Sequence, residues 1–407
     1  MTIRGRVIPG GAETGERLHN GPETEVAGGA AASPETMDAV PWMALNSVDG
    51  VGKVLYKRLI LRFGSPEKVF AAGKSELASV DGMGPKALQG IKGFKGWKEA
   101  RNEVKKARAL GADVVTFADP RYPYNLKEIH DPPPYLYVLG ELTVGDKISV
   151  AMVGSRNASH YGLSETKRIA RDLAVKGITI VSGGARGIDT EAHRGALSGG
   201  GRTIAVLGCG IDVTYPRENG ELFKKIAESG AVITEYPVGT PPDKANFPSR
   251  NRIISGISLG VIVMEAAKDS GSLITASYSV EQNREVYALP GNVSADNSRG
   301  VNSLIKKGAK LIEGPADVLE DLFPYMKGYV SELALDYGDA PEKTAVMPPL
   351  GPDEMSVYSQ ISLEPVHVDV IAEKTGFPVS RILSLLLDME LKGLVRQISG
   401  MNYIKEI

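Results

Sequence analysis

Short apolar runs alternate with helical stretches over the middle of the chain. Runs such as 259–266 are apolar at almost every position, whereas segments such as 163–177 carry apolar residues at the spacing of an α-helix. Continuous apolar strands that alternate with helices are typical of a parallel sheet covered on both faces. The pattern therefore predicts a doubly wound α/β domain over residues 111–325. Its seven predicted strands are 148–154, 178–184, 203–210, 231–237, 259–266, 285–291 and 309–314.

The pattern changes on both sides of this α/β segment. Residues 1–40 are rich in Gly, Ala, Glu and Pro without an apolar period, which predicts a disordered leader. Residues 42–110 have a helical period broken by Gly and Pro and predict an all-α domain, while the proline-dense stretch 119–140 is expected to be an ordered connector. A polar stretch, 326–354, is predicted to be a linker. Two helical patterns and two short strand patterns in 355–407 predict a winged helix.

The all-α segment contains the same phrase twice. Residues 47–53 read SVDGVGK, and 32 residues later the chain reads SVDGMGPK. Gly-hydrophobic-Gly between two helices permits a tight hairpin, because glycine adopts a positive φ without penalty, and it leaves N–H groups free to bind phosphate. The doubled phrase resembles a helix-hairpin-helix (SAM-like) pair that binds nucleic-acid backbones, although hairpins used only for packing remain an alternative. The candidate residues of these auxiliary hairpins are Gly50, Gly52, Lys53, Gly82, Gly84 and Lys86.

The charge of the chain is unevenly distributed. The whole protein has a formal net charge of −2, yet residues 42–110 contain 14 basic and 6 acidic residues, a net charge of +8. Residues 1–41 and 111–407 carry −3 and −7. A compact basic segment can attract phosphate even in an acidic protein. A solvated lysine-rich surface explains the same charge equally well, so charge alone does not decide.

Glycine-rich and cationic segments follow the predicted strands. Ligands of open parallel sheets bind beyond the carboxyl ends of the strands. Glycine lets the backbone approach a phosphate closely, and hydroxyl groups and helix N-termini supply donors. We therefore predict a bound anion at this edge. The candidate residues are Gly154, Ser155 and Arg156 after the first strand, Gly183, Gly184, Arg186 and Gly187 after the second, Lys244, Phe247, Arg250, Asn251 and Arg252 after the fourth, and Ser270, Gly271 and Ser272 after the fifth.

Two phosphate-binding motifs are absent from the sequence, and one aromatic residue is present, and together they indicate which anion could bind. No GxGxxG follows the first strand and no GxxxxGK[ST] occurs, so neither a standard dinucleotide site nor a P-loop is predicted. Phe247 stands among cations, an arrangement that suits stacking on an unpaired base while the cations hold phosphates. The alternative is that Phe247 anchors its segment to the core and the arginines cap carbonyl groups. The residues by themselves leave both interpretations open.

A catalytic set is not visible. The five histidines are scattered without metal-ligand spacing, and His193 lies in a helical run where packing explains it. Cys209 is expected to be a small core residue. Asp189 and Glu265 are candidate carboxylates, but Asp189 can cap its helix and Glu265 can end a buried strand. We therefore predict no catalytic residues, no metal and no cofactor.

The number of cysteines and the length of the apolar runs indicate the compartment in which the protein is expected. One cysteine cannot form an intramolecular disulfide, which gives no support to an oxidising compartment. No apolar run reaches the roughly 18 residues of a membrane span, and the N-terminus lacks the apolar core of a signal peptide. A cytoplasmic protein that does not span a membrane is expected.

Taken together, the motifs resemble the DNA-processing protein A (DprA/Smf) family over about residues 45–407. The resemblance rests on Gly154, Ser155 and Arg156, on SGGARGID at 182–189 with Ala192 and His193, on Tyr215 and Pro216, on NFPSRNRIISG at 246–256, on Ser270, Gly271 and Ser272, and on Tyr122, Pro123, Leu126, the Asp131, Pro132 and Pro133 turn, and Leu289, Pro290 and Gly291. It implies an extended Rossmann-like domain and a non-enzymatic protein that binds single-stranded DNA, protects incoming DNA and loads RecA recombinase in natural transformation.

The resemblance also assigns partners and residue roles. It implies a homodimer, RecA as a partner, and a single-strand-binding protein as a further candidate partner. By position, the DNA groove would be lined by Arg156, Lys244, Phe247, Arg250, Asn251 and Arg252, with Gly154 and Ser155 beside them, and the loops 182–189 and 270–272 would support phosphate contacts.

Two other functions compete with this one. A nucleotide-processing enzyme of the phosphoribohydrolase type would carry a PGGxGTxxE motif, which this sequence lacks. A transcription regulator would read an operator with the winged helix. Residues 356–407, however, contain 5 basic and 6 acidic residues, and the second helix offers only Arg381 and Lys392 against Asp388 and Glu390. A protein contact or a weak duplex contact is therefore expected of this unit rather than specific operator binding.

Overall fold

The computed structural model describes residues 38–336, 350–362, 365–391, 394–398 and 400–405. Contacts divide the chain into two compact units, Met1–Met326 and Lys327–Ile407. The predicted leader, apart from its last three residues, and the middle of the predicted linker lie outside the described residues. Within the described part, no helix combines the length and apolarity needed to cross a membrane.

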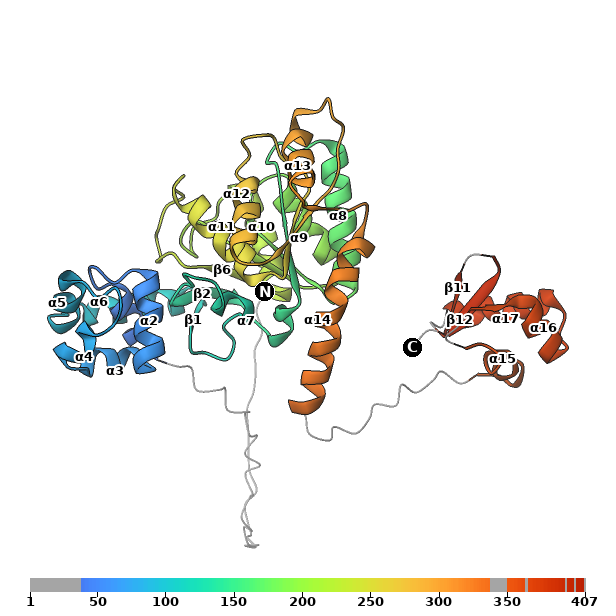
Figure 1. Ribbon diagram of the computed structural model, residues 1–407, viewed down its shortest axis with the longest axis horizontal. Coiled ribbons are helices and arrows are strands. Elements are labelled where there is room, and N and C mark those ends of the chain that lie inside the picture. The colour runs from blue at the N-terminus through green and yellow to red at the C-terminus, as the bar shows by residue number, and fades with distance from the viewer. Residues whose placement is uncertain (1–37, 337–349, 363–364, 392–393, 399, 406–407) are drawn as a thin grey trace, which may run out of the picture. The chain divides into compact units, whose positions relative to one another are not determined.

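A nine-stranded sheet forms the centre of the first unit (Figure 1). The strand order is β1-β2-β6-β5-β4-β3-β7-β8-β9. The strands from β3 to β9 run parallel, and β1 and β2 are antiparallel additions at one edge. The bounds are β1 Asp113–Thr116, β2 Tyr135–Gly140, β3 Ser149–Val153, β4 Thr179–Ser182, β5 Thr203–Val206, β6 Ala231–Thr234, β7 Gly260–Val263, β8 Glu285–Ala288 and β9 Lys310–Leu311. All seven predicted strands are therefore confirmed, each shorter than expected.

The strand order reverses at β3. This strand pairs with β4 on one side and with β7 on the other, so the chain leaves β3 and β7 in opposite directions along the sheet. Such a switch point opens a crevice beyond the carboxyl ends of the two strands, which is where ligands of doubly wound sheets bind.

Successive side chains of a strand point to opposite faces of the sheet. Both faces are therefore apolar, and helices cover both of them. In β5, Ala205 belongs to one apolar core, whereas its neighbours Ile204 and Val206 belong to the other. The first core includes Ile226 of α10, and the second includes Ile253 of α11. The helices of this region are α7 Tyr124–Lys127, α8 His160–Val175, α9 Ile188–Ser198, α10 Gly220–Ser229, α11 Asn246–Ile257, α12 Ser272–Glu281, α13 Asp296–Lys306 and α14 Pro315–Asp336, with short 3₁₀ turns at Val144–Lys147 and Arg217–Asn219.

The proline-dense stretch is ordered, as expected, but it is more than a connector. It contains α7 and the buried strand β2, which pairs antiparallel with both β1 and β6. Pro132, Pro133 and Pro134 all precede the first residue of β2, so no strand residue lacks its N–H donor. The position of the prolines, rather than their number, decides the local structure.

The all-α segment forms six helices that share a core with the sheet. They are α1 Val40–Asn46, α2 Lys53–Phe63, α3 Pro66–Ala71, α4 Lys74–Ala78, α5 Pro85–Lys92 and α6 Trp97–Ala109. Trp42 and Leu59 pack in the same apolar cluster as Tyr137 of β2. Glu103 of α6 accepts hydrogen bonds from the Tyr137 hydroxyl at 3.0 Å and from the Val238 N–H at 2.7 Å. The helical segment is thus docked on the α/β domain and belongs to the same compact unit.

Both predicted hairpins have the expected backbone. Gly50 and Gly82 adopt φ values of +86° and +85°, and Gly52 and Gly84 are the N-caps of α2 and α5. An added Cβ on Gly50 would lie 2.9 Å from the backbone nitrogen of Ala87, so the first hairpin abuts the start of α5. The two hairpins therefore pack against each other.

The second unit is a winged helix, as predicted. Helices α15 Pro352–Tyr358, α16 Val368–Thr375 and α17 Val379–Leu391 accompany a sheet of β10 Val366–His367, β12 Asn402–Lys405 and β11 Val395–Ile398, in that order. Ile371, Ile382 and Leu386 belong to its own apolar core. The predicted linker is corrected at both ends, because α14 continues to Asp336 with Pro324 inside it and α15 begins at Pro352.

Candidate functional site

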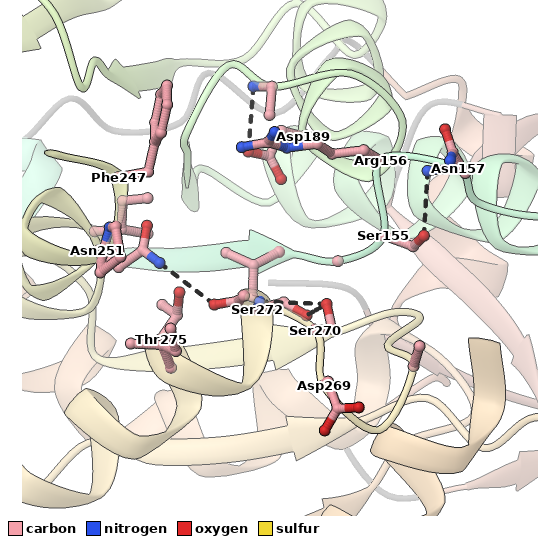
Figure 2. Close-up of a pocket in the computed structure, with 18 of the residues that line it drawn as sticks. Ser155, Arg156, Asn157, Asp189, Phe247, Asn251, Asp269, Ser270, Ser272 and Thr275 are labelled. Carbon is pink, nitrogen blue, oxygen red and sulfur yellow. Dashed lines mark hydrogen bonds between the residues drawn. The ribbon is translucent and has the colours of Figure 1, made fainter. Parts of the chain in front are cut away.

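A pocket of about 680 Å³ lies at the predicted edge of the sheet. Figure 2 shows Phe247 and Asn251 on one side of it, Ser155 and Asn157 on the other, and Ser270 and Ser272 between them. Its lining comes from the loops after β3, β4 and β7 and from α11, α12 and α13. The switch point of the sheet therefore carries the site. The lining residues are Val153, Gly154, Ser155, Arg156, Asn157, Ala185, Asp189, Phe247, Pro248, Arg250, Asn251, Ile254, Ala267, Lys268, Asp269, Ser270, Gly271, Ser272, Ile274, Thr275, Asp296 and Arg299.

Helix α11 presents its residues to the pocket with a helical period. Phe247, Asn251 and Ile254 are spaced by four and three residues and all line the pocket. The sequence pattern of 244–252 predicts one cationic segment at the sheet edge. Because the segment is a helix from Asn246 onward, only one stripe of it faces the pocket.

Phe247 lies at the rim between charges and a second ring. The guanidinium carbon of Arg156 is 5.3 Å from its ring centroid, and that of Arg250 is 5.9 Å away. The Tyr215 ring lies 5.7 Å away at an interplanar angle of 33°. Phe247 is only partly buried and Arg156 is exposed. A partly exposed aromatic ring and an exposed cation that lies over it are thus brought together at the pocket.

Arg250 lines the pocket, but one end of its guanidinium is engaged by the protein, while its buried Nε has no hydrogen-bond partner. Its side chain is buried, and Nη1 donates hydrogen bonds to the Gly183 carbonyl at 2.7 Å and to the Val206 carbonyl. Burial lowers the pKa of Arg250, and the nearby carboxylate of Asp189 opposes that effect. Arg250 therefore caps carbonyl groups at the ends of β4 and β5, as the alternative interpretation of the sequence proposed for the arginines.

The expected groove contact of Arg252 is wrong for this structure. Its side chain is only 4% exposed and forms ion pairs with Glu235 at 2.6 Å and Asp131 at 3.2 Å. Arg252 is five residues after Phe247, which turns it by about 140° around the helix axis. It points to the junction with the helical segment, where Glu235 also pairs with Lys53 at 2.7 Å.

The two candidate carboxylates, Asp189 and Glu265, form hydrogen bonds that stabilise the segments beside them. Asp189 accepts a hydrogen bond from the Ala185 N–H at 3.3 Å, and burial raises its pKa while the charge of Arg250 acts to lower it. Glu265 accepts from the Ser159 N–H at 2.9 Å and from the Ser159 hydroxyl at the start of α8. Asp189 lines the pocket and orders its loop, whereas Glu265 lies outside the lining and caps a helix.

His193 and Cys209 are core residues, as the sequence suggested. The Nδ1 atom of His193 lies 2.7 Å from the Thr203 hydroxyl, and burial lowers the pKa of His193 to about 3. Burial likewise raises the pKa of the Cys209 thiol to about 11. Neither residue is among those that line the pocket.

The pocket offers several donors to an anion. Helix α12 begins there with Gly271 as its N-cap. Its first N–H groups already have partners, because Ser272 donates to the Ser270 hydroxyl at 3.4 Å, Leu273 to the Ser270 carbonyl at 3.0 Å and Ile274 to the Gly271 carbonyl at 3.2 Å. The hydroxyls of Ser270 and Ser272 lie 2.7 Å apart, and Asn251 donates to the Gly271 carbonyl at 3.4 Å. The arrangement suits a phosphate group held by these hydroxyls and by the positive end of the α12 dipole.

Several predicted residues lie outside this lining. Lys244 is exposed just before α11, and Arg186 is exposed and ion-paired with Glu218. Gly183, Gly184 and Gly187 shape the β4 loop without lining the pocket.

The cations of the hairpins also have partners within the protein. Lys86 pairs with Asp49 of the first hairpin at 3.1 Å, and Arg58 pairs with Asp81 of the second at 2.8 Å. Lys53 pairs with Glu235. Phosphate binding by the hairpins stays a prediction, and a phosphate there would have to compete with these carboxylates.

Sequence reasoning missed other residues of the site. Asn157, Asp269, Thr275 and Arg299 line the pocket. Asn157 immediately follows the predicted Gly154, Ser155 and Arg156, and Asp269 precedes Ser270. Both belong to the loops that the sequence predicts at this edge, although neither is among the candidate residues, whereas Thr275 and Arg299 lie within helices.

The backbone of the loop after β4 requires glycine at position 187, and this requirement can be tested. Gly187 has φ of +74°, and an added Cβ would lie 2.3 Å from the Ser155 carbonyl oxygen. We expect Gly187→Ala to lower the free energy of unfolding by roughly 2–4 kcal/mol, which combines a positive-φ penalty with a backbone clash. Gly200 is a matched control, since its φ is +67° and no atom would lie within 4 Å of an added Cβ. Gly200→Ala should cost about 1–2 kcal/mol in urea denaturation, and equal losses in the two variants would contradict the clash.

Two family models match this chain, one in each of its two compact units. The family described as DNA recombination-mediator protein A matches residues 113–323, and the DprA winged helix domain matches residues 341–401. Protein Smf of Synechocystis is 37% identical over 387 residues, which is 89% of this chain and 97% of that protein. The DNA processing protein DprA of Bacillus subtilis is 41% identical and covers 53% of this chain and 73% of its own length. The X-ray structure of DprA from Streptococcus pneumoniae is similar with a TM-score of 0.60 at 34% identity, over 70% of this chain and 98% of that one.

Proposed function

Because the chain belongs to the DNA recombination-mediator protein A (DprA/Smf) family, we propose that it binds single-stranded DNA without sequence preference and mediates recombination in natural transformation. The observation that carries the proposal is the rim of the pocket. There an exposed cation, Arg156, lies over the ring of Phe247, and the same pocket contains the N-terminus of α12 and the hydroxyls of Ser270 and Ser272. These groups match the base and the phosphate of one nucleotide.

Single strands suit this rim better than duplexes. An aromatic face stacks on any unpaired base and contributes about 1–3 kcal/mol per base, irrespective of sequence. In duplex DNA the faces of the bases are covered by their neighbours. Backbone N–H groups and hydroxyls contact phosphates without reading bases. Binding is therefore expected to be independent of sequence and weakened by salt.

We propose binding rather than catalysis. Asp189 is used to order the β4 loop, and Glu265 is used to cap α8. A nucleotide-processing enzyme is the second candidate, and release of free base from a panel of nucleotides would support it. The winged helix is proposed to contact protein or, weakly, duplex DNA. Arg381 already pairs with Asp353, while Lys392 lies outside the described residues.

The partners of this activity are also proposals. We propose that the protein acts in the cytoplasm as a homodimer, protects incoming single strands and loads RecA recombinase on them. A single-strand-binding protein is a further proposed partner. The helical hairpins are proposed as auxiliary phosphate contacts, secondary to the pocket.

A titration of labelled single strands and duplexes of equal length, at low and high salt, tests the function. We expect the single strand to bind at least about tenfold more tightly and both affinities to fall with salt. Preferential binding to the duplex, or release of a base, would contradict the proposal.

Removing the winged helix should leave that preference intact. The winged helix has its own apolar core, and the pocket lies wholly within the first unit. A chain that ends at residue 336 is therefore expected to bind the single strand within about threefold of the full chain, roughly 0.6 kcal/mol. A loss of about a hundredfold would move the principal DNA contact to the second unit.

A further inference from the structure

A second aromatic ring stands beside the first, outside the pocket. Tyr215 is 40% exposed and does not line the pocket, yet its ring lies 5.7 Å from that of Phe247 with a tilt of only 33°. Phe247 lines the pocket, and Tyr215 lies beside it. The two rings form a short aromatic surface that leads out of the site.

The loop that carries Tyr215 is fixed on both sides of this ring. Pro216 is buried, and Asn219 donates hydrogen bonds to the Gly184 carbonyl at 3.0 Å and to the Thr190 hydroxyl at 2.9 Å. Before the ring, the Val213 N–H donates to the Gly210 carbonyl at 3.0 Å. An exposed ring on an anchored loop loses little conformational freedom when a ligand stacks on it.

The spacing of the rings limits how DNA could use them. A base inserted between two rings needs about 6.8 Å, twice the stacking rise of about 3.4 Å, and 5.7 Å is too short. Each ring can instead receive its own base on the part of the ring that the protein leaves exposed, with both bases on the same side of the ring pair. Since 5.7 Å exceeds about 3.4 Å, two neighbouring bases bound in this way would be separated from each other as well as from a complementary strand.

A cation lies on the same side. Glu218, three residues after Tyr215, forms an ion pair with Arg186, whose side chain is 65% exposed. An exposed pair of this kind contributes little by itself, so its guanidinium can turn to a phosphate at small cost. The segment between β5 and α10 therefore supplies a ring and lies beside a cation, which repeats the combination of Phe247 and Arg156.

We propose that Tyr215 is a second stacking position, which receives the nucleotide next to the one held at Phe247 and directs the strand out of the pocket toward Arg186. This inference rests on the proposed function, because it assumes that the pocket binds a single strand. It adds a residue, a direction for the strand and a minimum of two unstacked nucleotides per site.

Three variants test the role of the ring by fluorescence anisotropy with a labelled oligo-dT. Tyr215→Ala is expected to weaken binding about 5- to 10-fold, near the lower limit for one stacked base, whereas Tyr215→Phe keeps the ring and should stay within about twofold. Tyr124→Ala is the matched control, because Tyr124 is 58% exposed and lies away from the pocket lining. It should bind like the wild type.

Oligonucleotides with a single abasic position separate stacking from a structural effect. The wild type is expected to lose affinity for abasic substitution at two adjacent positions, and Tyr215→Ala to become insensitive at one of them. If Tyr215→Ala binds like the wild type while Phe247→Ala does not, the second position is disproved and the proposed function stands. If the wild type prefers duplex DNA, the proposed function fails and takes the second position with it. If Tyr215→Phe loses as much affinity as Tyr215→Ala, the ring is not a stacking surface.

Discussion

Arg252→Ala is expected to lower the free energy of unfolding by about 3 kcal/mol. Removing one partner of a buried ion pair costs about 3–5 kcal/mol, because the other charge is left uncompensated. The lower end applies here, since Lys53 still lies 2.7 Å from Glu235 when Arg252 is removed. Asp131, which is about one-third exposed, can regain water. Urea denaturation followed by circular dichroism measures the loss.

The control for this variant is Arg194→Ala. Arg194 is an exposed residue whose pair with Glu191 lies three residues away on one helix, and such pairs contribute about 0.5 kcal/mol or less. The folded fraction of Arg252→Ala should retain most of its affinity for single strands. A stable Arg252→Ala protein with greatly reduced DNA affinity would show that the side chain contacts DNA after all.

Phe247→Ala is expected to weaken single-strand binding by about 5- to 150-fold, the equivalent of the 1–3 kcal/mol of one stacked base. Its ring is the surface over which Arg156 lies, so the same change also removes the support of that cation. The fold should tolerate the change, since Phe247 is only partly buried at the first turn of α11. Anisotropy titrations with a labelled single strand measure the loss.

Phe247→Leu and Phe247→Trp distinguish stacking from anchoring. Leucine keeps an apolar side chain that could hold α11 to the β5 loop, where an added Cβ on Gly208 would lie 2.8 Å from the Phe247 ring. Tryptophan keeps an aromatic face. If stacking is the role, Trp should preserve binding and Leu should lose most of it. Wild-type affinity in Phe247→Leu would identify Phe247 as a loop anchor.

The parallel sheet could be predicted because its strands are buried on both faces. Seven continuous apolar runs separated by helical patterns admit few other arrangements. The antiparallel strand β2 could not, since its prolines suggest a connector although they all precede Tyr135. Its pairing with β6 joins residues 137–140 to 231–234, a contact that no local pattern encodes.

The site could be predicted only to the level of loops. The carboxyl ends of parallel strands share one edge, which places Gly154, Arg156, Phe247 and Ser270 around one pocket. A prediction at the level of loops does not resolve the phase of α11, so it puts Arg252 on the same side as Phe247. The true partners of Arg252, Asp131 and Glu235, come from distant segments and are set by tertiary packing.

The hairpins illustrate the same limit. The repeated phrase predicts their turns, and the positive φ values of Gly50 and Gly82 confirm them. Nothing in the phrase indicates that Lys53 binds Glu235 or that Lys86 binds Asp49. The use of a charged side chain depends on which carboxylate the fold places beside it.

Photo-crosslinking of a single strand that contains iodouracil, followed by mass spectrometry of the attached peptides, probes directly which surface touches the bases. Attachment concentrated at Phe247, with a second site at Tyr215, is the predicted result. Attachment confined to the helical hairpins or to the winged helix, with none at the sheet edge, would contradict the account.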